Sequence, residues 1–193
     1  MGGLLPTPME TMKVKDMPAL YIESLQDLFS AETQLTYALP KVEAAVSSEV
    51  LKEAIRSHLE ETKNQAARLA TLLNELGEEP GGVNCRAMEG LIRETDELIR
   101  DVEDPMVRDA ALIGGSQKVE HYEISGYGTA RTFAMLLGHD EHAKTLQATL
   151  DEEYSADKKL GALATSMINE RAMQAGKTSG GQEAQSMISE GGL

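Results

Sequence analysis

The sequence lacks the features on which disulfide-stabilised and membrane-spanning proteins depend. It has one cysteine in 193 residues, Cys85, so no disulfide can form within the chain. No apolar run approaches the roughly 20 residues that a membrane-spanning helix needs. Residues 1–12 also lack the basic region that precedes the apolar core of a signal peptide. Together these absences predict a protein of the reducing cytoplasm with no membrane partner.

Positive charge is also scarce. The chain has 18 basic and 32 acidic residues, which gives a formal net charge of -14. Such a surface repels nucleic acids and anionic lipids. The final segment, from Gln174 onward, contains a single basic residue, Lys177, which is too few to neutralise a DNA backbone. We therefore expect no nucleic-acid partner.

Aromatic residues make up only 4% of the chain and tryptophan is absent, whereas Ala, Leu, Met and Glu are common. This mixture favours helix over strand. Apolar residues recur at steps of three and four, which predicts four long helices over about residues 17–46, 49–76, 105–137 and 140–167. A shorter helix is predicted over about residues 88–102 by the same spacing. The fold class is therefore all-α.

Residues that start and stop helices stand at the ends of these segments. Asp16 and Asp104-Pro105 stand where two of the long helices begin, and Gly77 and Gly138 stand where two of them end. Pro40 lies inside the first helix and is predicted to kink or shorten it. These signals make the helix boundaries predictable from local chemistry.

The long helices form two tight hairpins joined by a long connection, residues 78–103. Ser47 and Ser48 supply the turn of the first hairpin and the N-cap of its second helix. The connection is long enough to cross the length of a bundle, which is ferritin-like connectivity rather than up-down-up-down. We predict a ferritin-like four-helix bundle over residues 16–173 with an additional shorter helix in the crossover. Residues 1–15 are an N-terminal extension, and the Gly/Ser/Gln-rich residues 174–193 are a disordered tail.

Acidic residues interrupt the apolar stripe near the middle of the long helices. Positions equidistant from a hairpin turn face each other, because a helix rises a fixed distance per residue. Glu32 and Glu61 are each about fourteen residues from the first turn, and Glu123 and Glu153 are each about fifteen from the second. Glu120 lies one helical turn before Glu123. These five carboxylates are therefore predicted to meet at one level of the bundle.

Carboxylates buried together are costly unless protons or cations neutralise them. The pattern predicts a metal site with these five glutamates as ligands and with Gln65, Asp157 and His58 as secondary candidates. Carboxylate and imidazole donors suit iron or manganese, and zinc less decisively. Two alternatives stay open. A single acid can lie solvated at the edge of its stripe, and His58 can be a ligand, a partner of a ligand or a satisfied core histidine.

Other conspicuous residues have simpler explanations. Cys85 follows a Pro/Gly-rich loop without an activating partner, which predicts a structural role. His139 and His142 lie at the second hairpin turn and are expected to be exposed, whereas Tyr122, Tyr127 and Tyr154 are expected to pack in the core. Glycines in the third long helix predict either a close approach of a neighbouring helix or a dimer contact. These glycines are Gly114, Gly115, Gly126 and Gly128.

Over about residues 17–172 the sequence resembles the YciF-like branch of the ferritin-like superfamily. The resemblance rests on several motifs taken together: Ala38-Leu39-Pro40-Lys41, His58-Leu59-Glu60-Glu61-Thr62, Ala87-Met88-Glu89-Gly90-Leu91, Val107-Arg108-Asp109-Ala110-Ala111-Leu112-Ile113, residues 119–131 and Leu150-Asp151-Glu152-Glu153. It implies a rubrerythrin-like helical bundle, a homodimer and a site for two metal ions, with iron first and manganese or zinc as alternatives. It also implies a stress-associated protein.

The sequence departs from one pattern of that superfamily. Diiron members usually carry Glu-x-x-His on two helices, but here Glu61 is followed at that spacing by Asn64, and Glu153 by Ala156. The second helix instead offers His58 before Glu61. We therefore expect a non-haem metal protein in stress-related metal or peroxide handling, without expecting oxygen activation. The alternative is a non-enzymatic structural or interaction protein with a degenerate site.

Overall fold

The computed structural model describes residues 14–175, and within that range the chain forms five α-helices and no strand. They are α1 (Met17–Ala45), α2 (Glu49–Glu75), α3 (Arg86–Asp101), α4 (Pro105–Leu136) and α5 (Asp140–Leu163). A π-helical segment, η1 (Ala164–Ile168), and helical residues 169–175 follow α5. The prediction of an all-α chain is confirmed. Over residues 14–175, no helix combines the length and the apolar character that crossing a membrane requires.

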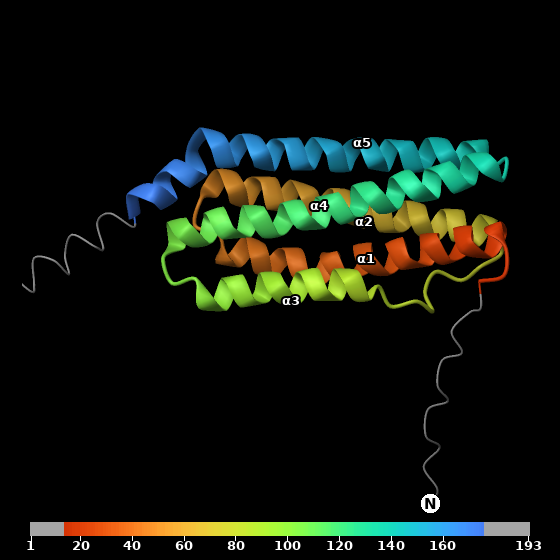
Figure 1. Ribbon diagram of the computed structural model, residues 1–193, viewed down its shortest axis with the longest axis horizontal. Coiled ribbons are helices and arrows are strands. Elements are labelled where there is room, and N and C mark those ends of the chain that lie inside the picture. The colour runs from red at the N-terminus through yellow and green to blue at the C-terminus, as the bar shows by residue number, and fades with distance from the viewer. Residues whose placement is uncertain (1–13, 176–193) are drawn as a thin grey trace, which may run out of the picture.

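The four long helices run side by side, and α3 lies along α1 and α4 at one end of the molecule (Figure 1). The α1–α2 turn and the α4–α5 turn lie at opposite ends of the long axis (Figure 1). Between the hairpins, α3 carries the chain back along the bundle before α4 begins. The hairpins contact each other through the pairs α1 with α4 and α2 with α5. The interior of the bundle is therefore lined by all four long helices.

The helix ends follow the local signals in the sequence. The Asp16 carboxylate accepts a hydrogen bond from the Ala19 backbone N–H at 2.9 Å, and Asp104 caps α4 by accepting from the N–H groups of Met106 and Val107. Gly77 and Gly138 follow α2 and α4 with φ of 78° and 76°, a conformation that favours glycine. Helix α1 runs through Pro40 to Ala45, so the proline does not end it early.

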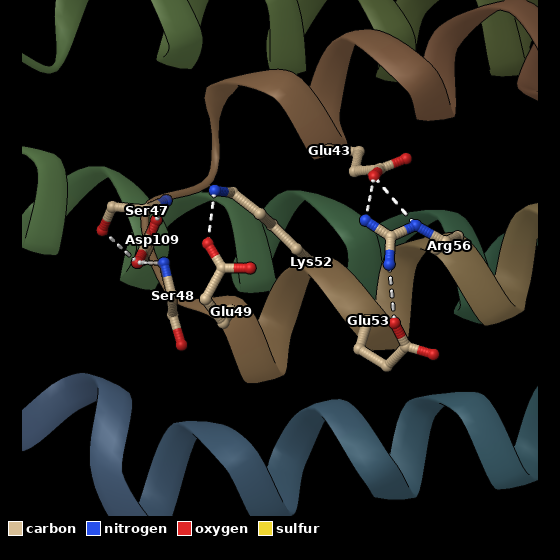
Figure 2. Close-up of polar contacts among 8 residues, drawn as sticks. All are labelled: Glu43, Ser47, Ser48, Glu49, Lys52, Glu53, Arg56 and Asp109. Carbon is tan, nitrogen blue, oxygen red and sulfur yellow. Dashed lines mark hydrogen bonds and ion pairs between the residues drawn. The ribbon is translucent and has the colours of Figure 1, made fainter.

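A buried carboxylate ties α4 to the α1–α2 turn (Figure 2). Asp109, 3% exposed, accepts hydrogen bonds from the Ser47 N–H at 2.8 Å, the Ser47 hydroxyl at 2.6 Å and the Ser48 N–H at 2.9 Å. Ser48 precedes α2 as predicted, but its side chain makes no capping hydrogen bond. The aspartate on a distant helix supplies the acceptor instead. The exposed Arg56–Glu43 pair joins α1 and α2 nearby (Figure 2).

The apolar interior is divided into two clusters. One includes Leu35, Ile55 and Val119, and the other includes Leu25 and Leu69, each with further apolar neighbours. Every long helix contributes to both clusters. Buried polar residues separate the two contributions in α2, α4 and α5, and in α1 Glu32 lies beside the boundary, next to Ala31. The polar residues therefore form a layer across the middle of the bundle, as the interrupted apolar stripes predicted.

Two of the four glycines in α4 allow a neighbouring side chain to approach closely. A Cβ on Gly126 would lie 2.7 Å from Leu28 Cδ2, and one on Gly115 would lie 3.1 Å from Thr95 Oγ1. A Cβ on Gly114 or Gly128 would meet no atom within 4 Å. The predicted close approach is thus confirmed for Gly126 and Gly115 only.

Three expectations need comment. The expectation that Tyr154 packs in the core was wrong, because it is 55% exposed. The expectation that His142 is exposed was wrong: it is 7% exposed, with Nδ1 3.0 Å from the Tyr21 hydroxyl and Nε2 3.0 Å from Glu75 Oε2. Tyr21 lies near the start of α1, 121 residues before His142, so only the fold brings it to this turn. The predicted tail begins at Gln174, but the helix continues to residue 175, and the rest of the tail lies outside the described residues.

Candidate metal centre

Five ionisable side chains from all four long helices meet in the central polar layer. Glu32 comes from α1, His58 from α2, Glu120 and Glu123 from α4, and Glu153 from α5. The four glutamates are 0–1% exposed and His58 is 7% exposed. One donor atom from each of His58, Glu120, Glu123 and Glu153 lies within 4.8 Å of the others. Such spacing brings four donor atoms within reach of a common ion.

Hydrogen bonds satisfy only part of this layer. The Tyr127 hydroxyl donates to Glu32 Oε1 at 2.5 Å, and the Gln65 amide donates to Glu153 Oε1 at 2.5 Å. Neither oxygen of Glu123 has a partner, and neither ring nitrogen of His58 makes a hydrogen bond. The remaining unpartnered buried atoms in the layer are Glu32 Oε2, Thr62 Oγ1, Gln65 Oε1, Glu120 Oε2 and Glu153 Oε2.

Burial and mutual repulsion raise the pKa of every glutamate in the layer. Burial raises the pKa of Glu32 from 4.5 to about 7, although the Tyr127 hydrogen bond and the nearby His58 act in the opposite direction. Burial and the charges of Glu32 and Glu153 raise the pKa of Glu123 well above its ordinary value. The pKa values of Glu120 and Glu153 are raised chiefly by burial. Without a cation, the layer therefore favours protonated carboxyl groups.

The pKa of His58 is also raised, but for a different reason. Burial lowers its pKa, but contact with Glu61 and the charges of Glu120 and Glu32 outweigh burial and leave the pKa raised. Its Nε2 lies 3.3 Å from Glu120 Oε1 and its Nδ1 lies 3.8 Å from Glu61 Oε2. The imidazole is thus held between a buried carboxylate and a half-exposed one.

The donor set fits a divalent cation. The unpartnered buried atoms are mainly carboxylate oxygens and imidazole nitrogens, which iron, manganese and zinc accept as ligands. Positive charge at this point would satisfy several acceptors at once and offset the repulsion among the glutamates. These residues therefore fit the divalent metal ions that the sequence suggested.

Comparison with known proteins places the chain in a family. Residues 16–173 match the family described as "Domain of unknown function (DUF892)". The chain belongs to this family. It is 46% identical over 162 residues to Protein YciF of Escherichia coli (strain K12), and the aligned region covers 83% of this chain and 98% of YciF.

Solved structures agree with this assignment. The crystal structure of the E. coli stress protein YciF matches with a TM-score of 0.77 at 46% identity, covering 81% of this chain and 99% of YciF. YcfI from Rhodopseudomonas palustris, named a candidate structural protein, matches with a TM-score of 0.76 at 42% identity, covering 78% and 96%. This DUF892 chain therefore shares its helical fold with a stress protein.

The structure does not bring two of the predicted ligands into the polar layer. The Glu61 side chain is 43% exposed and lies beside His58, and its Oε1 is 3.5 Å from the Ser57 hydroxyl. The Asp157 side chain is 26% exposed, accepts a hydrogen bond from Gln117 at 2.9 Å and lies 3.5 Å from the exposed His121. Both side chains are thus partly exposed and lie outside the group of four buried donor residues.

Gln65 lies in the layer, held by residues that the sequence analysis did not select. Its amide nitrogen donates to both Glu153 and Glu152, at 2.5 and 3.1 Å. Glu152 in turn receives two hydrogen bonds from Arg68, at 2.7 and 2.8 Å. The Arg68–Glu152 ion pair thus joins α2 and α5 beside the layer. The available signal was spacing: Arg68 follows Gln65 by three residues, and Glu152 directly precedes Glu153.

Tyr122 and Cys85 form a separate polar group outside the layer. The Tyr122 hydroxyl donates to Asp27 and lies 2.8 Å from Cys85 Sγ. Burial raises the pKa of the Cys85 thiol, and Cys85 is 1% exposed. A buried thiol with a raised pKa is a poor nucleophile, which agrees with the predicted structural role.

Proposed function

We propose that this DUF892 chain is a ferritin-like, non-haem metal protein whose central polar layer holds two divalent cations. Iron is the first candidate, and manganese or zinc are alternatives. Glu32, His58, Glu120, Glu123 and Glu153 would hold the ions. The observation that supports this proposal is the set of buried carboxylate oxygens and imidazole nitrogens that have no hydrogen-bond partner. Natural proteins seldom leave so many buried polar atoms unpaired.

Each residue around the layer has a distinct part in this proposal. Tyr127 orients Glu32 through its hydrogen bond, which leaves Glu32 Oε2 available. Gln65 orients Glu153 in the same way, and the Arg68–Glu152 pair fixes Gln65. The two apolar clusters on either side exclude water. A bound iron or manganese pair would supply redox and Lewis-acid chemistry at this point.

The biological role that follows is protection under stress through handling of metal ions or peroxide. The relative YciF is named a stress protein, and a buried carboxylate layer is suited to sequestering reactive cations. We also propose that the chain acts in the cytoplasm as a homodimer.

A second candidate function is supported by the name of one relative. YcfI is named a candidate structural protein, so the alternative is a helical structural protein whose polar layer holds no metal. In that case the glutamates stay protonated, as their raised pKa values favour. The two candidates therefore differ in metal content.

Metal analysis of chain purified without an affinity tag distinguishes these functions. After chelator treatment and dialysis against Fe(II) under nitrogen, Mn(II) or Zn(II), we expect about two ions per chain for at least one metal. The double variant Glu32→Met with Glu123→Met should lose them. Glu60→Gln, which alters an exposed glutamate paired with Lys63, is the matched control. Fewer than about a tenth of an ion per chain for all three metals would favour the structural alternative.

A further inference from the structure

A polar pocket leads from solvent to the buried layer between α2, α4 and α5. Its volume is about 80 Å³, and its lining includes Glu61, Lys159, Ser57, His58 and Glu120. Lys159 is exposed and Glu61 is half-exposed, whereas His58 and Glu120 are buried. The lining thus passes from solvent-facing charges to two of the proposed metal ligands. A space of this size holds several water molecules.

Two carboxylates and an imidazole follow one another along this pocket. Glu61 Oε2 lies 3.8 Å from His58 Nδ1, and His58 Nε2 lies 3.3 Å from Glu120 Oε1. Neither nitrogen of this buried imidazole makes a hydrogen bond. Because a metal ion binds nitrogen and oxygen ligands at about 2 Å, one ion can bridge the two donor atoms of each pair, so an ion that leaves Glu61 can contact the next donor before it loses the previous one.

The other pocket that reaches His58 and Glu120 is poorly suited to a hydrated cation. Its volume is only about 20 Å³, and most of its lining is apolar, including Leu35, Leu39 and Val119. Its carboxylate, Asp96, lies 3.8 Å from Lys41, so its charge is already partly compensated. A divalent ion would have to lose its water before it met a ligand there.

We propose that the polar pocket is the entrance for divalent cations, with Glu61 as a transfer ligand that takes an ion from solvent and passes it to His58 and Glu120. This inference rests on the proposed metal centre and adds its route of loading. Glu61 is then a ligand during loading and not in the filled site. Lys159, whose charge opposes the entering ion, slows the same step.

The test measures the rate of loading and the final metal content separately. Metal-free chain is mixed with Co(II) at low ionic strength, and the visible absorption of the bound ion is followed by stopped flow. Glu61→Gln should slow loading about threefold to tenfold, because one negative charge near the path of a divalent ion is lost. The final number of Co(II) ions per chain should stay that of the wild type.

Matched controls lie beside each altered residue. Glu60→Gln removes the adjacent exposed charge, which does not line the pocket, and should leave the rate unchanged. Asp96→Asn removes the carboxylate of the apolar pocket and should also leave it unchanged. Lys159→Gln should speed loading about threefold, because it removes the opposing charge, whereas Lys158→Gln should not. Glu60→Gln and Lys158→Gln make the same changes in net charge away from the pocket lining, so unchanged rates in these two variants exclude a general effect of net charge.

The outcomes separate this inference from the proposed function. A wild-type rate in Glu61→Gln with normal Co(II) content overturns the transfer role and leaves the metal centre standing. Loss of bound Co(II) in Glu61→Gln overturns it too, because Glu61 would then be a resident ligand. Slower loading in Asp96→Asn would assign the entrance to the apolar pocket. If the wild-type chain binds no Co(II), the metal centre and its entrance both fail.

Discussion

Asp109 and Glu123 are both buried carboxylates on α4, but they differ in their hydrogen-bond partners. The oxygens of Asp109 accept three hydrogen bonds from Ser47 and Ser48, at the N-terminus of α2, where backbone N–H groups and the helix dipole favour an anion. The oxygens of Glu123 accept none. Burial alone therefore does not identify a functional acid. A buried carboxyl group without a partner is the better candidate, because leaving its oxygens without hydrogen bonds is costly.

The largest effect should come from removing the satisfied acid. Asp109→Ala leaves two backbone N–H groups and a hydroxyl without their acceptor, so the free energy of unfolding should fall by about 3–5 kcal/mol. Urea unfolding followed by circular dichroism measures this change, with chelator and with Mn(II). The loss should be equal in both conditions, because Asp109 lies outside the polar layer. A fall below about 1 kcal/mol would show that water replaces these bonds.

Removing the unsatisfied acid should have the opposite sign. Glu123→Met keeps the volume of the side chain and removes the cost of burying an acid, so the metal-free chain should become more stable by about 1–4 kcal/mol. The stabilisation that metal gives to the wild type should disappear in this variant. Thermal unfolding with chelator and with Fe(II) or Mn(II) tests both parts. A variant that matches the wild type in chelator and still gains from metal would place Glu123 outside any metal site.

The pH dependence of stability should reveal the same layer. Because the folded-state pKa of Glu32 is raised from 4.5 to about 7, the folded chain holds more protons than the unfolded chain over that window. Glu32 alone should therefore lower the stability of the metal-free chain by about 1–3 kcal/mol as pH rises from 4.5 to 7. The raised pKa values of the other three glutamates of the layer act in the same direction.

Two comparisons sharpen this pH prediction. Glu32→Met should make the fall shallower without abolishing it, because Glu120, Glu123 and Glu153 keep raised pKa values. Saturating Mn(II) should reverse the slope, since metal competes with protons for the same oxygens. A metal-free wild-type chain whose stability rises over this window would contradict the raised pKa values. Urea unfolding at intervals of pH provides the measurement.

The smallest effect should come from making Glu32 resemble Glu123. Tyr127→Phe removes the hydrogen bond to Glu32 Oε1, so neither oxygen of Glu32 then has a partner. We expect the metal-free chain to lose about 0.5–1.5 kcal/mol and to bind metal more weakly, because Glu32 is no longer oriented. Tyr154→Phe, at an exposed tyrosine, is the control. Equal thermal unfolding of the two variants would mean that the Tyr127 bond contributes nothing.

The helices could be predicted because their signals are local. Capping aspartates, terminal glycines and apolar spacing act over three or four residues, and the structure places the helix ends close to where these signals stand. The inward orientation of Glu32, Glu120, Glu123 and Glu153 was predictable for a related reason. Each acid stands within an apolar stripe, and a stripe marks the buried face whatever residue interrupts it.

The rest of the site could not be predicted from the distance of each residue to its hairpin turn. It also depends on the direction in which each side chain leaves its helix and on contacts between distant residues. Glu61 is at the right level, but each residue turns the helix by about 100°, and His58, Thr62 and Gln65 occupy the inward face. The 58-62-65 spacing indicates which face of α2 points inward, whereas the level of a residue along the bundle does not. Asp109 and its partners are separated by more than sixty residues in sequence, so no local pattern could have paired them.

The polar layer also has a consequence for unfolding. It separates two apolar clusters that share the same four long helices, so each end of the bundle has its own core. An ion held by all four helices would be released when either end opened. Metal binding in the layer would therefore couple the unfolding of the two ends. A bundle with two partly independent cores would then unfold as one cooperative unit.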